Sequence, residues 1–415
     1  MKIAMLTNNY KPFVGGVPIS IERLSGGLRS LGNEVKIFAP SYENQEEEEG
    51  VIRIRSLKKK LEGGCVMPDI LDPELELQFL RMEPDLIHVH HPMLMGYAAL
   101  YLGRKYKVPV AFTYHTRYEE YLHNIRAFRY LQQKSGREYR NSVRVVEEAV
   151  MSLTKNQLVP AHMRTFANLC DVVFAPTPAM EEYLREQGVK TQMEVLPTGL
   201  KMADFVPDGE ENALRRKLAG DKKYLLCTVS RLTKEKNLVF LLQGLARLKA
   251  RIGGCFRLLM IGGGPMEEEL RQLTKTLDLE DNVTFVGTVD NAKIGRYYRA
   301  CDLFVFASKS ETQGIVLLEA MAARNPVVAV DASGVCDIVK NGINGSKTRE
   351  DCEEWADRIG ELLLDAGTRE RLGQGAYETA LGYREDFVAR RAQAVYSQIL
   401  LGREERRRQH VGIVY

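Results

Sequence analysis

Residues 301–331 read CDLFVFASKSETQGIVLLEAMAARNPVVAVD, and this stretch decides the fold class. Its two apolar runs, LFVFAS and PVVAVD, have the length of buried strands, and the segment GIVLLEAMAA between them has the length and composition of a helix. A strand, a helix and a second strand in this order form the crossover unit of a parallel sheet. The stretch therefore predicts an α/β fold.

The same alternation continues on both sides of this stretch. Strand-length apolar runs occur as KIAML, EVKIFAP, VIRIR, DLIHVH, VPVAFTY and VVFAP in the first half, and as YLLCTVS, RLLMIGGG and VTFVG in the second. A chain of 415 residues exceeds what one core usually serves. We therefore expect two doubly wound domains over residues 1–205 and 206–385, with the break inside the charged, strand-free stretch 198–223 and a closing helix after the second domain.

The composition is that of an ordinary globular protein and narrows the functions. Lys and Arg number 58 against 55 Asp and Glu, so the net charge is +3, which excludes a surface that binds polyanions everywhere. The seven cysteines never occur as CxxC, so they predict neither a disulfide framework nor a zinc site. No apolar run approaches the roughly 18 residues that span a bilayer. We expect a cytoplasmic protein.

The stretch between the strand LFVFAS and its following helix carries the strongest chemical signal. Glu311 and Glu319 stand eight residues apart, so two carboxylates can bind different hydroxyl groups of one elongated ligand. The backbone N–H groups around residues 312–315 lie at a helix start, which attracts anions such as a diphosphate. The alternative interpretation is a plain helix start with a solvated acidic side chain.

Two cations follow the strand YLLCTVS of the second half. Arg231 offers a planar fork and Lys236 a point charge, a combination that suits a diphosphate. Both lie at the carboxyl end of a parallel strand, where α/β sheets bind ligands. The glycines at 262–264 follow the next strand, and we interpret them as a structural turn, because acidic residues in the helix after them would repel a phosphate.

The first half has two candidate features of its own. Gly15 and Gly16 precede a helix and would let a phosphate approach its N–H groups, although a tight strand-to-helix turn explains them equally well. His115 ends the strand VPVAFTY, where we expect an imidazole that faces a ligand rather than a satisfied buried histidine. The other histidines nearby have no carboxylate at metal-ligand spacing, and the chain has no D-x-D motif, so we expect no metal.

In their order, these motifs resemble the retaining glycosyltransferases of family 4, which have the GT-B fold. The resemblance covers nearly the whole chain and rests on the Gly15-Gly16 loop, His115, Arg231, Lys236, and Glu311 and Glu319 followed by AMAARNPVVA. It implies two Rossmann-like domains that face a central cleft, with a nucleotide-sugar held by the second domain and the acceptor mainly by the first. It also implies that the closing helix, residues 386–415, packs back on the first domain.

The resemblance further implies a role for each matching residue. The catalytic set is His115 at the reacting sugar, Arg231 and Lys236 at the diphosphate, and Glu311 at the sugar hydroxyls. The other implied donor contacts are Gly15 and Gly16 at the phosphate, Glu319 at the ribose, Val289 and Asn291 at the base, and the backbone of Gln313, Gly314 and Ile315 beside Glu311. No cofactor or metal is implied.

Two positions depart from the usual pattern of the family. Arg324 stands where members often have glycine, and Gln313 stands where they often have an aromatic residue. The first change affects packing in our interpretation. The second, in ETQG, together with TYHTRYEEYLH at residues 113–123, is similar to the bacterial and plant glycolipid synthases that glycosylate diacylglycerol.

A basic segment supports a lipid surface as a partner. Residues 126–144, RAFRYLQQKSGREYRNSVR, carry six cations against one acidic residue, with aromatic residues between them. Such a segment suits an anionic membrane surface, where each cation contributes on the order of 1 kcal/mol. The alternatives are a solvated helix and, least favoured, single-stranded nucleic acid. The cations predicted to contact the membrane or acceptor are Arg126, Arg129, Lys134, Arg137, Arg140 and Arg144.

Together, these features predict a metal-independent, retaining hexosyltransferase. It would move a sugar from a nucleotide donor resembling UDP-glucose to a lipid hydroxyl, with diacylglycerol favoured, as a cytoplasmic enzyme peripheral to the cell membrane. The alternatives are a polysaccharide or soluble acceptor, a GDP-mannose donor, a nucleotide-sugar epimerase, and a non-catalytic sugar-nucleotide-binding protein. The residues predict no nucleic-acid partner and no particular oligomeric state.

Overall fold

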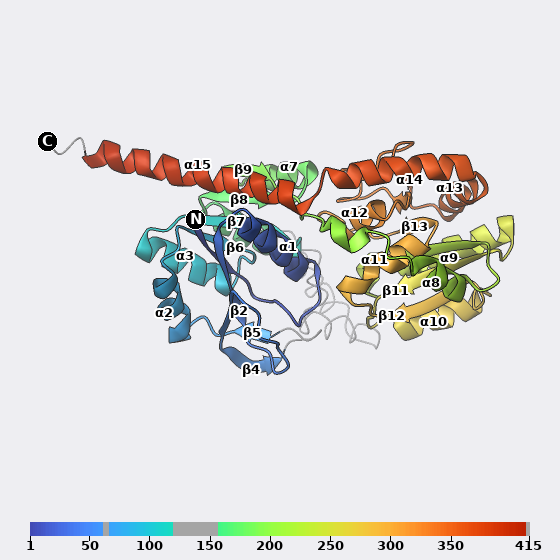
Figure 1. Cartoon of the computed structure of the whole chain (residues 1–415), viewed down its shortest axis with the longest axis horizontal. Coiled ribbons are helices and arrows are strands. Elements are labelled where there is room, and N and C mark those ends of the chain that lie inside the picture. Colours follow the sequence, from blue (N-terminus) through green and yellow to red (C-terminus); the bar gives the residue numbers. More distant parts are fainter. Residues whose placement is uncertain (61–65, 119–156, 412–415) are drawn as a thin grey trace, which may run out of the picture. The chain divides into compact units, whose positions relative to one another are not determined.

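The structure of the chain is a computed structural model that describes residues 1–60, 66–118 and 157–411, with the backbone alone at 58–60 and 406–411. It contains two compact units (Figure 1): unit 1 comprises residues 1–197 and the chain from Val388 onward, and unit 2 comprises Thr198–Phe387. The predicted boundaries after residues 205 and 385 differ from these. Residues 198–205 lie with unit 2 because Leu200 pairs with Arg384 and the 3-10 turn η4 (Met202–Phe205) contacts a helix of that unit.

Unit 1 is built on a parallel sheet of seven described strands. In sheet order they are β3 (Val51–Ile54), β2 (Glu34–Pro40), β1 (Lys2–Leu6), β6 (Leu86–Val89), β7 (Val110–Thr113), β8 (Val172–Ala175) and β9 (Met193–Val195). A small antiparallel hairpin, β4 (Ser56–Lys60) and β5 (Val66–Pro68), is separate from it. The central strands are buried along their whole length, as expected when helices cover both faces of a parallel sheet.

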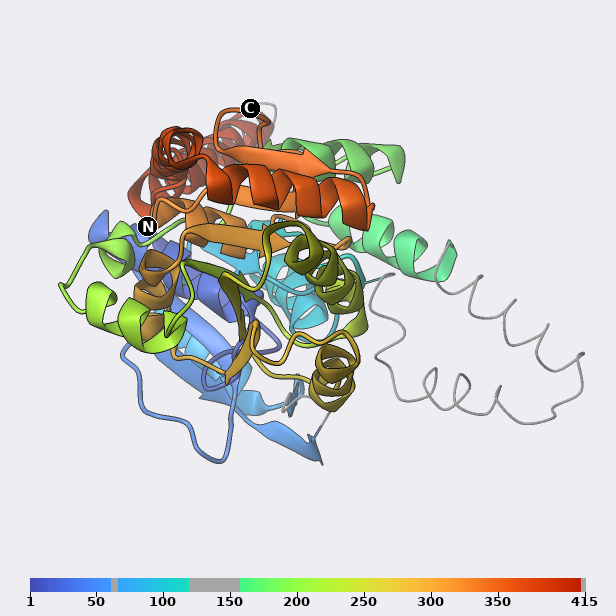
Figure 2. The same cartoon turned by 90° about the vertical axis from the view of Figure 1, so that its right-hand side faces the viewer.

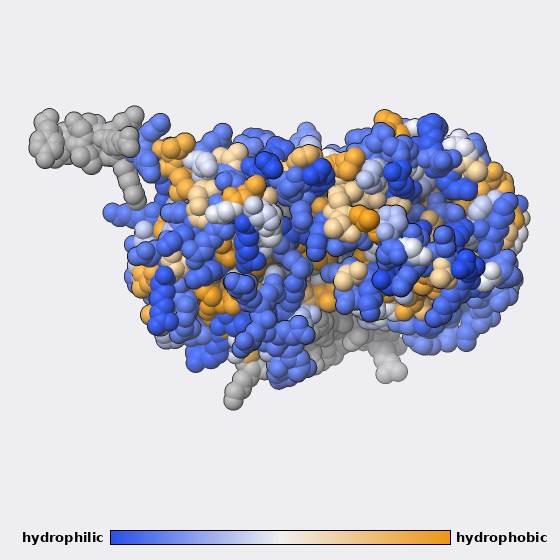
Figure 3. All heavy atoms as spheres, viewed as in Figure 1, coloured by the Kyte–Doolittle hydropathy of each residue, from blue (hydrophilic) through white to orange (hydrophobic). Residues whose placement is uncertain are grey.

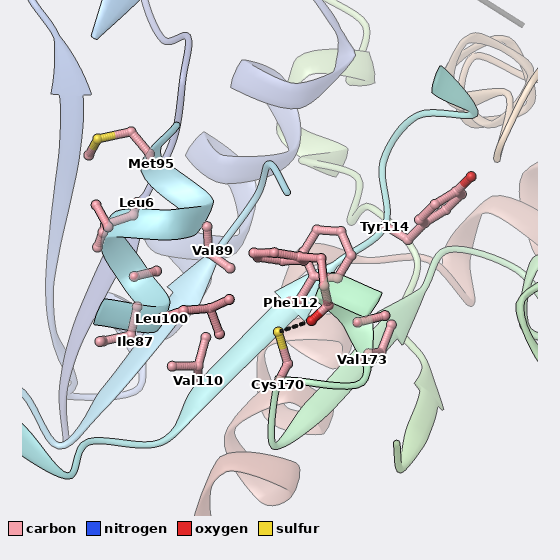
Figure 4. Packing of buried hydrophobic residues seen from close by; sticks show 14 of the residues in the cluster. Leu6, Ile87, Val89, Met95, Leu100, Val110, Phe112, Tyr114, Cys170 and Val173 are labelled. Carbon is pink, nitrogen blue, oxygen red and sulfur yellow. Dashed lines mark hydrogen bonds between the residues drawn. The ribbon is translucent and has the colours of Figure 1, made fainter. Parts of the chain in front are cut away.

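Helices form a core on each face of this sheet. One face packs against α2 (Pro73–Met82), α3 (Met95–Tyr106), α6 (Val159–Ala167) and α7 (Pro178–Glu186), and the other against α1 (Gly16–Ser30) and α15 (Glu385–Val411). In Figure 4, strand residues such as Ile87 and Val89 lie against Met95 and Leu100 of α3. On the opposite face, the buried side chains of α15 include Tyr396, so unit 1 needs the end of the chain to complete its core.

Unit 2 repeats the plan with six parallel strands. In sheet order they are β12 (Val283–Gly287), β11 (Phe256–Ile261), β10 (Tyr224–Val229), β13 (Leu303–Phe306), β14 (Val327–Val330) and β15 (Gly345–Thr348). This is the doubly wound order, whose direction reverses between β10 and β13. Both units confirm the predicted α/β fold with two Rossmann-like domains.

Helices also cover both faces of the unit 2 sheet (Figure 2). One core contains α9 (Leu238–Ile252), α10 (Glu267–Thr276) and α13 (Cys352–Leu364), and the other contains α8 (Glu211–Ala219), α11 (Asn291–Ala300), α12 (Ile315–Ala322) and α14 (Ala366–Leu381). The stretch 198–223, within which the break was expected, begins at the boundary between the units and holds η4 and α8. Its charged residues lie on the outside of helices that pack through few apolar positions.

The surface is mainly polar. On the face shown in Figure 3, hydrophilic residues predominate and hydrophobic ones form small groups. Within residues 1–60, 66–118 and 157–411, no helix combines the length and the apolar character needed to cross a bilayer.

Candidate active site

The direction of the unit 2 sheet reverses between β10 and β13, and the loops after these two strands carry the strongest sequence signals. Arg231 and Lys236 follow β10, and Lys236 ends the short 3-10 turn η5 (Lys234–Lys236). Glu311 follows β13 and precedes α12. Because neighbouring parallel strands end at the same edge of a sheet, residues separated by about 75 positions in sequence meet there.

Lys236 and Glu311 form a largely buried ion pair. Lys236 Nζ lies 2.5 Å from Glu311 Oε1, and the two side chains are 11% and 16% exposed. Burial raises the pKa of the Glu311 carboxyl, but the charge and hydrogen bond of Lys236 outweigh burial, so the net pKa lies below its ordinary value. Glu311 is therefore an ionised hydrogen-bond acceptor at neutral pH, held beside a cation.

Arg231 is more exposed and is oriented by a residue that the sequence did not single out. Its Nη2 lies 3.4 Å from Glu235 Oε1, and the Thr233 hydroxyl donates to the same oxygen at 2.7 Å. The side chain of Glu235 is 6% exposed, whereas that of Arg231 is 54% exposed. A buried carboxylate thus positions an accessible guanidinium. The sequence pattern did not predict a role for Glu235, because it is one charged residue among several in its loop.

Glu319 lies in α12, with its side chain turned into the unit. It is 6% exposed, and the hydroxyl of Tyr298, in α11, donates to its Oε2 at 3.2 Å. The buried partner was not predicted, because Tyr298 lies in a helix whose pattern is explained by core packing. Glu311 and Glu319 therefore stand on opposite sides of the α12 start, one in the loop and one in the helix.

The loop between these two carboxylates has a specific backbone conformation. Gly314 has φ 73° and precedes the first residue of α12, Ile315, so the loop turns at a position that favours glycine. Gly334 also has a positive φ, and a Cβ there would lie 2.5 Å from the Glu311 carbonyl oxygen. Gln313, which precedes Gly314 in this loop, is buried at 3% exposure. The N–H groups at the start of α12 can donate hydrogen bonds to an anion.

The remaining predicted positions of unit 2 lie on the same edge of the sheet or near it. Val289 follows β12 and is half-buried against the core, while Asn291 begins α11 and is exposed. The glycine turn after β11 packs against the Arg231 loop: a Cβ at Gly262 would lie 1.9 Å from the carbonyl oxygen of Ser230. This close approach explains why position 262 is a glycine, since any side chain there would clash with the Ser230 backbone.

In unit 1, Gly15 and Gly16 stand at the start of α1. Gly15 is the N-cap residue with extended backbone, and a Cβ there would lie 3.1 Å from the ring of Phe13. The first turn of α1 contains no acidic residue and receives no side-chain cap. Its N–H groups therefore suit an anion, and the contact of Gly15 and Gly16 with a phosphate stays a prediction.

His115 is half-buried and lies with the buried histidines His88 and His90 near the carboxyl ends of β6 and β7. His115 Nε2 lies 2.9 Å from His90 Nδ1, and their rings stack. His88 contacts the Thr113 hydroxyl at 2.6 Å and the Tyr396 hydroxyl of α15 at 2.7 Å. Burial lowers the pKa of His90 and His115 well below the ordinary value, so both rings are neutral at pH 7. His115 can act there as a neutral hydrogen-bonding group.

The structure does not describe every predicted residue. The six cations predicted to contact a membrane lie within residues 126–144, outside the described residues. Among the described residues, no group of three or more His, Cys, Asp or Glu side chains is arranged to hold a metal ion.

Comparison with known proteins agrees with the architecture. Residues 14–203 match the model of "Glycosyltransferase Family 4", and residues 210–379 match that of "Glycosyl transferases group 1". The alpha-monoglucosyldiacylglycerol synthase of Streptococcus pneumoniae is 29% identical over 341 residues, which cover 79% of this chain and 71% of that protein. The protein of the same name in Acholeplasma laidlawii is 25% identical over 412 residues, covering 96% and 98%. Among solved structures, sucrose-phosphate synthase from Thermosynechococcus elongatus superposes with a TM-score of 0.77 at 20% identity, covering 97% of this chain and 99% of that one.

Proposed function

Because the chain belongs to the family 4, or group 1, glycosyltransferases and has their GT-B fold, we propose that it transfers a sugar to a lipid. We propose in particular a retaining hexosyltransferase. The proposed donor is a nucleotide-sugar resembling UDP-glucose. The proposed acceptor is a lipid hydroxyl, with diacylglycerol favoured over a soluble or polysaccharide acceptor. The proposed enzyme works without a metal ion or a bound cofactor.

The buried pair of Lys236 and Glu311 beside Arg231 is the observation that supports this proposal. A diphosphate leaving group gains negative charge as the bond to the sugar breaks, and two permanent cations at the site would stabilise that charge. Glu311, ionised at neutral pH, would accept hydrogen bonds from the sugar hydroxyls. The N–H groups at the start of α12 would add further donors to the diphosphate.

The proposed chemistry takes place on one face of the sugar. The bond from the anomeric carbon to the diphosphate oxygen breaks, and a new bond from that carbon to the acceptor oxygen forms on the same side. The proton of the acceptor hydroxyl passes to the departing diphosphate oxygen, so no external base is needed. His115, neutral and held by His90, would hydrogen-bond to the reacting sugar.

A lipid acceptor is supported by two kinds of observation. The curated relatives just described carry the name monoglucosyldiacylglycerol synthase, at 25–29% identity. In the sequence, the motif ETQG resembles that of glycolipid synthases, and the basic segment 126–144 independently suits an anionic membrane surface. We therefore propose a cytoplasmic enzyme that associates peripherally with the membrane.

An assay of sugar transfer tests the proposal. Purified protein is incubated with UDP-glucose and vesicles that contain phosphatidylglycerol and diacylglycerol, and both UDP release and glucolipid formation are measured. We expect release that depends on diacylglycerol, an α-linked product by NMR, and a rate that EDTA does not reduce. GDP-mannose and vesicles without diacylglycerol are the comparison arms. Transfer only to a soluble sugar, or donor consumption without any acceptor, would contradict the proposal.

Two variants connect the assay to the site. Glu311→Gln keeps the shape of the side chain and removes its charge, and we expect turnover to fall by about 10–10²-fold, because a hydrogen bond to a charged group contributes about 1.5–3 kcal/mol. Glu370→Gln makes the same change at an exposed position of α14 and should leave turnover unchanged. Equal turnover of the two variants would remove Glu311 from the reaction.

A further inference from the structure

The side chain of Gln313 is bonded to a single distant residue in both directions. The N–H of Thr198 donates to Gln313 Oε1 at 2.7 Å, and Gln313 Nε2 donates to the Thr198 carbonyl oxygen at 3.3 Å. The two residues are 3% and 7% exposed. A carboxamide offers a donor and an acceptor side by side, so the Gln313 side chain can bond to both the N–H and the carbonyl oxygen of Thr198.

One end of this contact lies in the loop that carries the donor-site residues. Gln313 stands between Glu311 and Gly314, and the loop is fixed on its other side because Ser310 pairs with Ser333. The backbone at Gly314 is bonded into the first turn of α12, because the N–H of Leu317 donates to the Gly314 carbonyl oxygen at 2.9 Å. A shift of the Gln313 side chain would therefore move the backbone N–H groups that lead into α12.

The other end lies where the chain passes between units. Thr198 is the first residue of unit 2, and Leu200, two residues on, is bonded to the segment that leaves it. The N–H of Leu200 donates to the Tyr383 carbonyl oxygen at 2.7 Å, and the N–H of Glu385 donates to the Leu200 carbonyl oxygen at 2.9 Å. The segment that Gln313 holds therefore contacts both places where the chain crosses from one unit to the other.

We propose that Gln313 is a positioning residue that couples the donor loop to these two chain crossings. The inference rests on the proposed function in placing a nucleotide-sugar at Glu311 and the start of α12. A ligand that stabilises the loop would then stabilise the pairing with Thr198. By linkage, stabilising that pairing strengthens binding of the ligand by the same factor.

The physical reason for the coupling is the cost of separating the two segments. If the loop moved alone, both hydrogen bonds between the Gln313 side chain and the Thr198 backbone would break at a buried position, which costs free energy. The loop and the Thr198 segment therefore move together. Leucine at position 313 can neither donate nor accept, and glutamate can accept but not donate, so both replacements uncouple the segments while keeping the side-chain volume.

Hydrogen exchange with and without UDP tests this coupling in the full-length protein. In the wild type, we expect UDP to slow exchange of the backbone amides at residues 198–200 and 383–385. In Gln313→Leu and Gln313→Glu, we expect UDP to bind about tenfold more weakly, the loss expected for one net hydrogen bond, and to leave exchange at these amides unchanged. A general loss of stability in a variant would not produce this result, because exchange with UDP is compared with exchange without UDP in the same protein.

Thr198→Ser is the matched control. Since Gln313 contacts the backbone of Thr198 and serine keeps the hydroxyl, this variant should keep both the UDP affinity and the UDP-dependent protection of the wild type. If Gln313→Leu and Gln313→Glu bind UDP like the wild type and show the same protection at 198–200, the coupling is refuted while the proposed function stands. If the wild type binds neither UDP nor UDP-glucose, the proposed function fails and takes this inference with it.

Discussion

Replacing Lys236 by methionine would leave the Glu311 carboxylate buried without its cation. Removing one partner of a fully buried ion pair costs about 3–5 kcal/mol. The two side chains here keep 11% and 16% exposure, and Arg231 also attracts Glu311, so we expect unit 2 to lose about 2–3 kcal/mol at pH 7. Turnover should fall by about 10²–10³-fold, because a donor to the leaving group is lost.

The pH dependence of this loss follows from the pKa of Glu311. In the wild type the folded-state pKa is lowered, so the pair contributes stability above the ordinary value of 4.5, and this is lost as the pH falls through the folded-state pKa. In Lys236→Met burial dominates and raises the pKa, so protonation relieves the buried charge as the pH falls. The stability difference between the two proteins should be largest at pH 7 and shrink towards pH 4.

Trp355 makes this measurement specific to unit 2. It is the one tryptophan of the chain and is fully buried in the core between α9 and α13, so its fluorescence during urea unfolding reports that unit. Lys275→Met, at an exposed position of α10, controls for the loss of a lysine elsewhere in the unit. A loss below about 0.5 kcal/mol at pH 7, or a loss that is equal at pH 7 and pH 4, would refute the reasoning.

Three further predictions concern packing and protonation in each unit. Tyr396→Phe should destabilise unit 1 by about 1–2 kcal/mol, measured by circular dichroism during urea unfolding, because His88 loses a buried hydrogen bond. A shift of the Trp355 fluorescence transition to lower urea would contradict the assignment of this loss to unit 1. Burial lowers the pKa of both His88 and His91 to about 3. Unit 1 should therefore lose stability as the pH falls from about 6.5 towards 3, because the unfolded state binds protons that the folded state does not. A urea midpoint of unit 1 that stays constant between pH 7 and pH 5 would disprove this prediction. Gly244→Ala should cost about 1–3 kcal/mol by Trp355 fluorescence, because a Cβ there would lie 2.5 Å from the indole ring; an unchanged midpoint would show that α13 shifts freely.

Much of the fold could be predicted from the sequence because most strands are buried on both faces. Runs such as LFVFAS and PVVAVD are apolar at successive positions, which marks a parallel strand covered by helices on each side. The edge strand β15, Gly345–Thr348, was missed because it is short and polar. The closing helix expected over residues 386–415 is α15, which runs from Glu385 to Val411.

The candidate site could be predicted only in part. Arg231, Lys236 and Glu311 stand out because cations and carboxylates at strand ends have few structural explanations. Glu235 and Tyr298, which orient Arg231 and bond to Glu319, gave no signal, because a charged loop residue and a core tyrosine are ordinary where they stand. Their roles depend on contacts made in three dimensions.

The sequence by itself determined the two-domain α/β architecture and which residue types stand at the strand ends. Hydrophobic periodicity marks each strand and helix through local chain geometry, and their alternation along the chain indicates the fold class. Only the tertiary structure decided which of those residues meet. It brought Lys236 within 2.5 Å of Glu311 and directed Gln313 to the backbone of Thr198, 115 residues away. The physical reason is that a hydrogen bond depends on distance and burial, and the doubly wound topology sets both by joining strand ends that are remote in the chain.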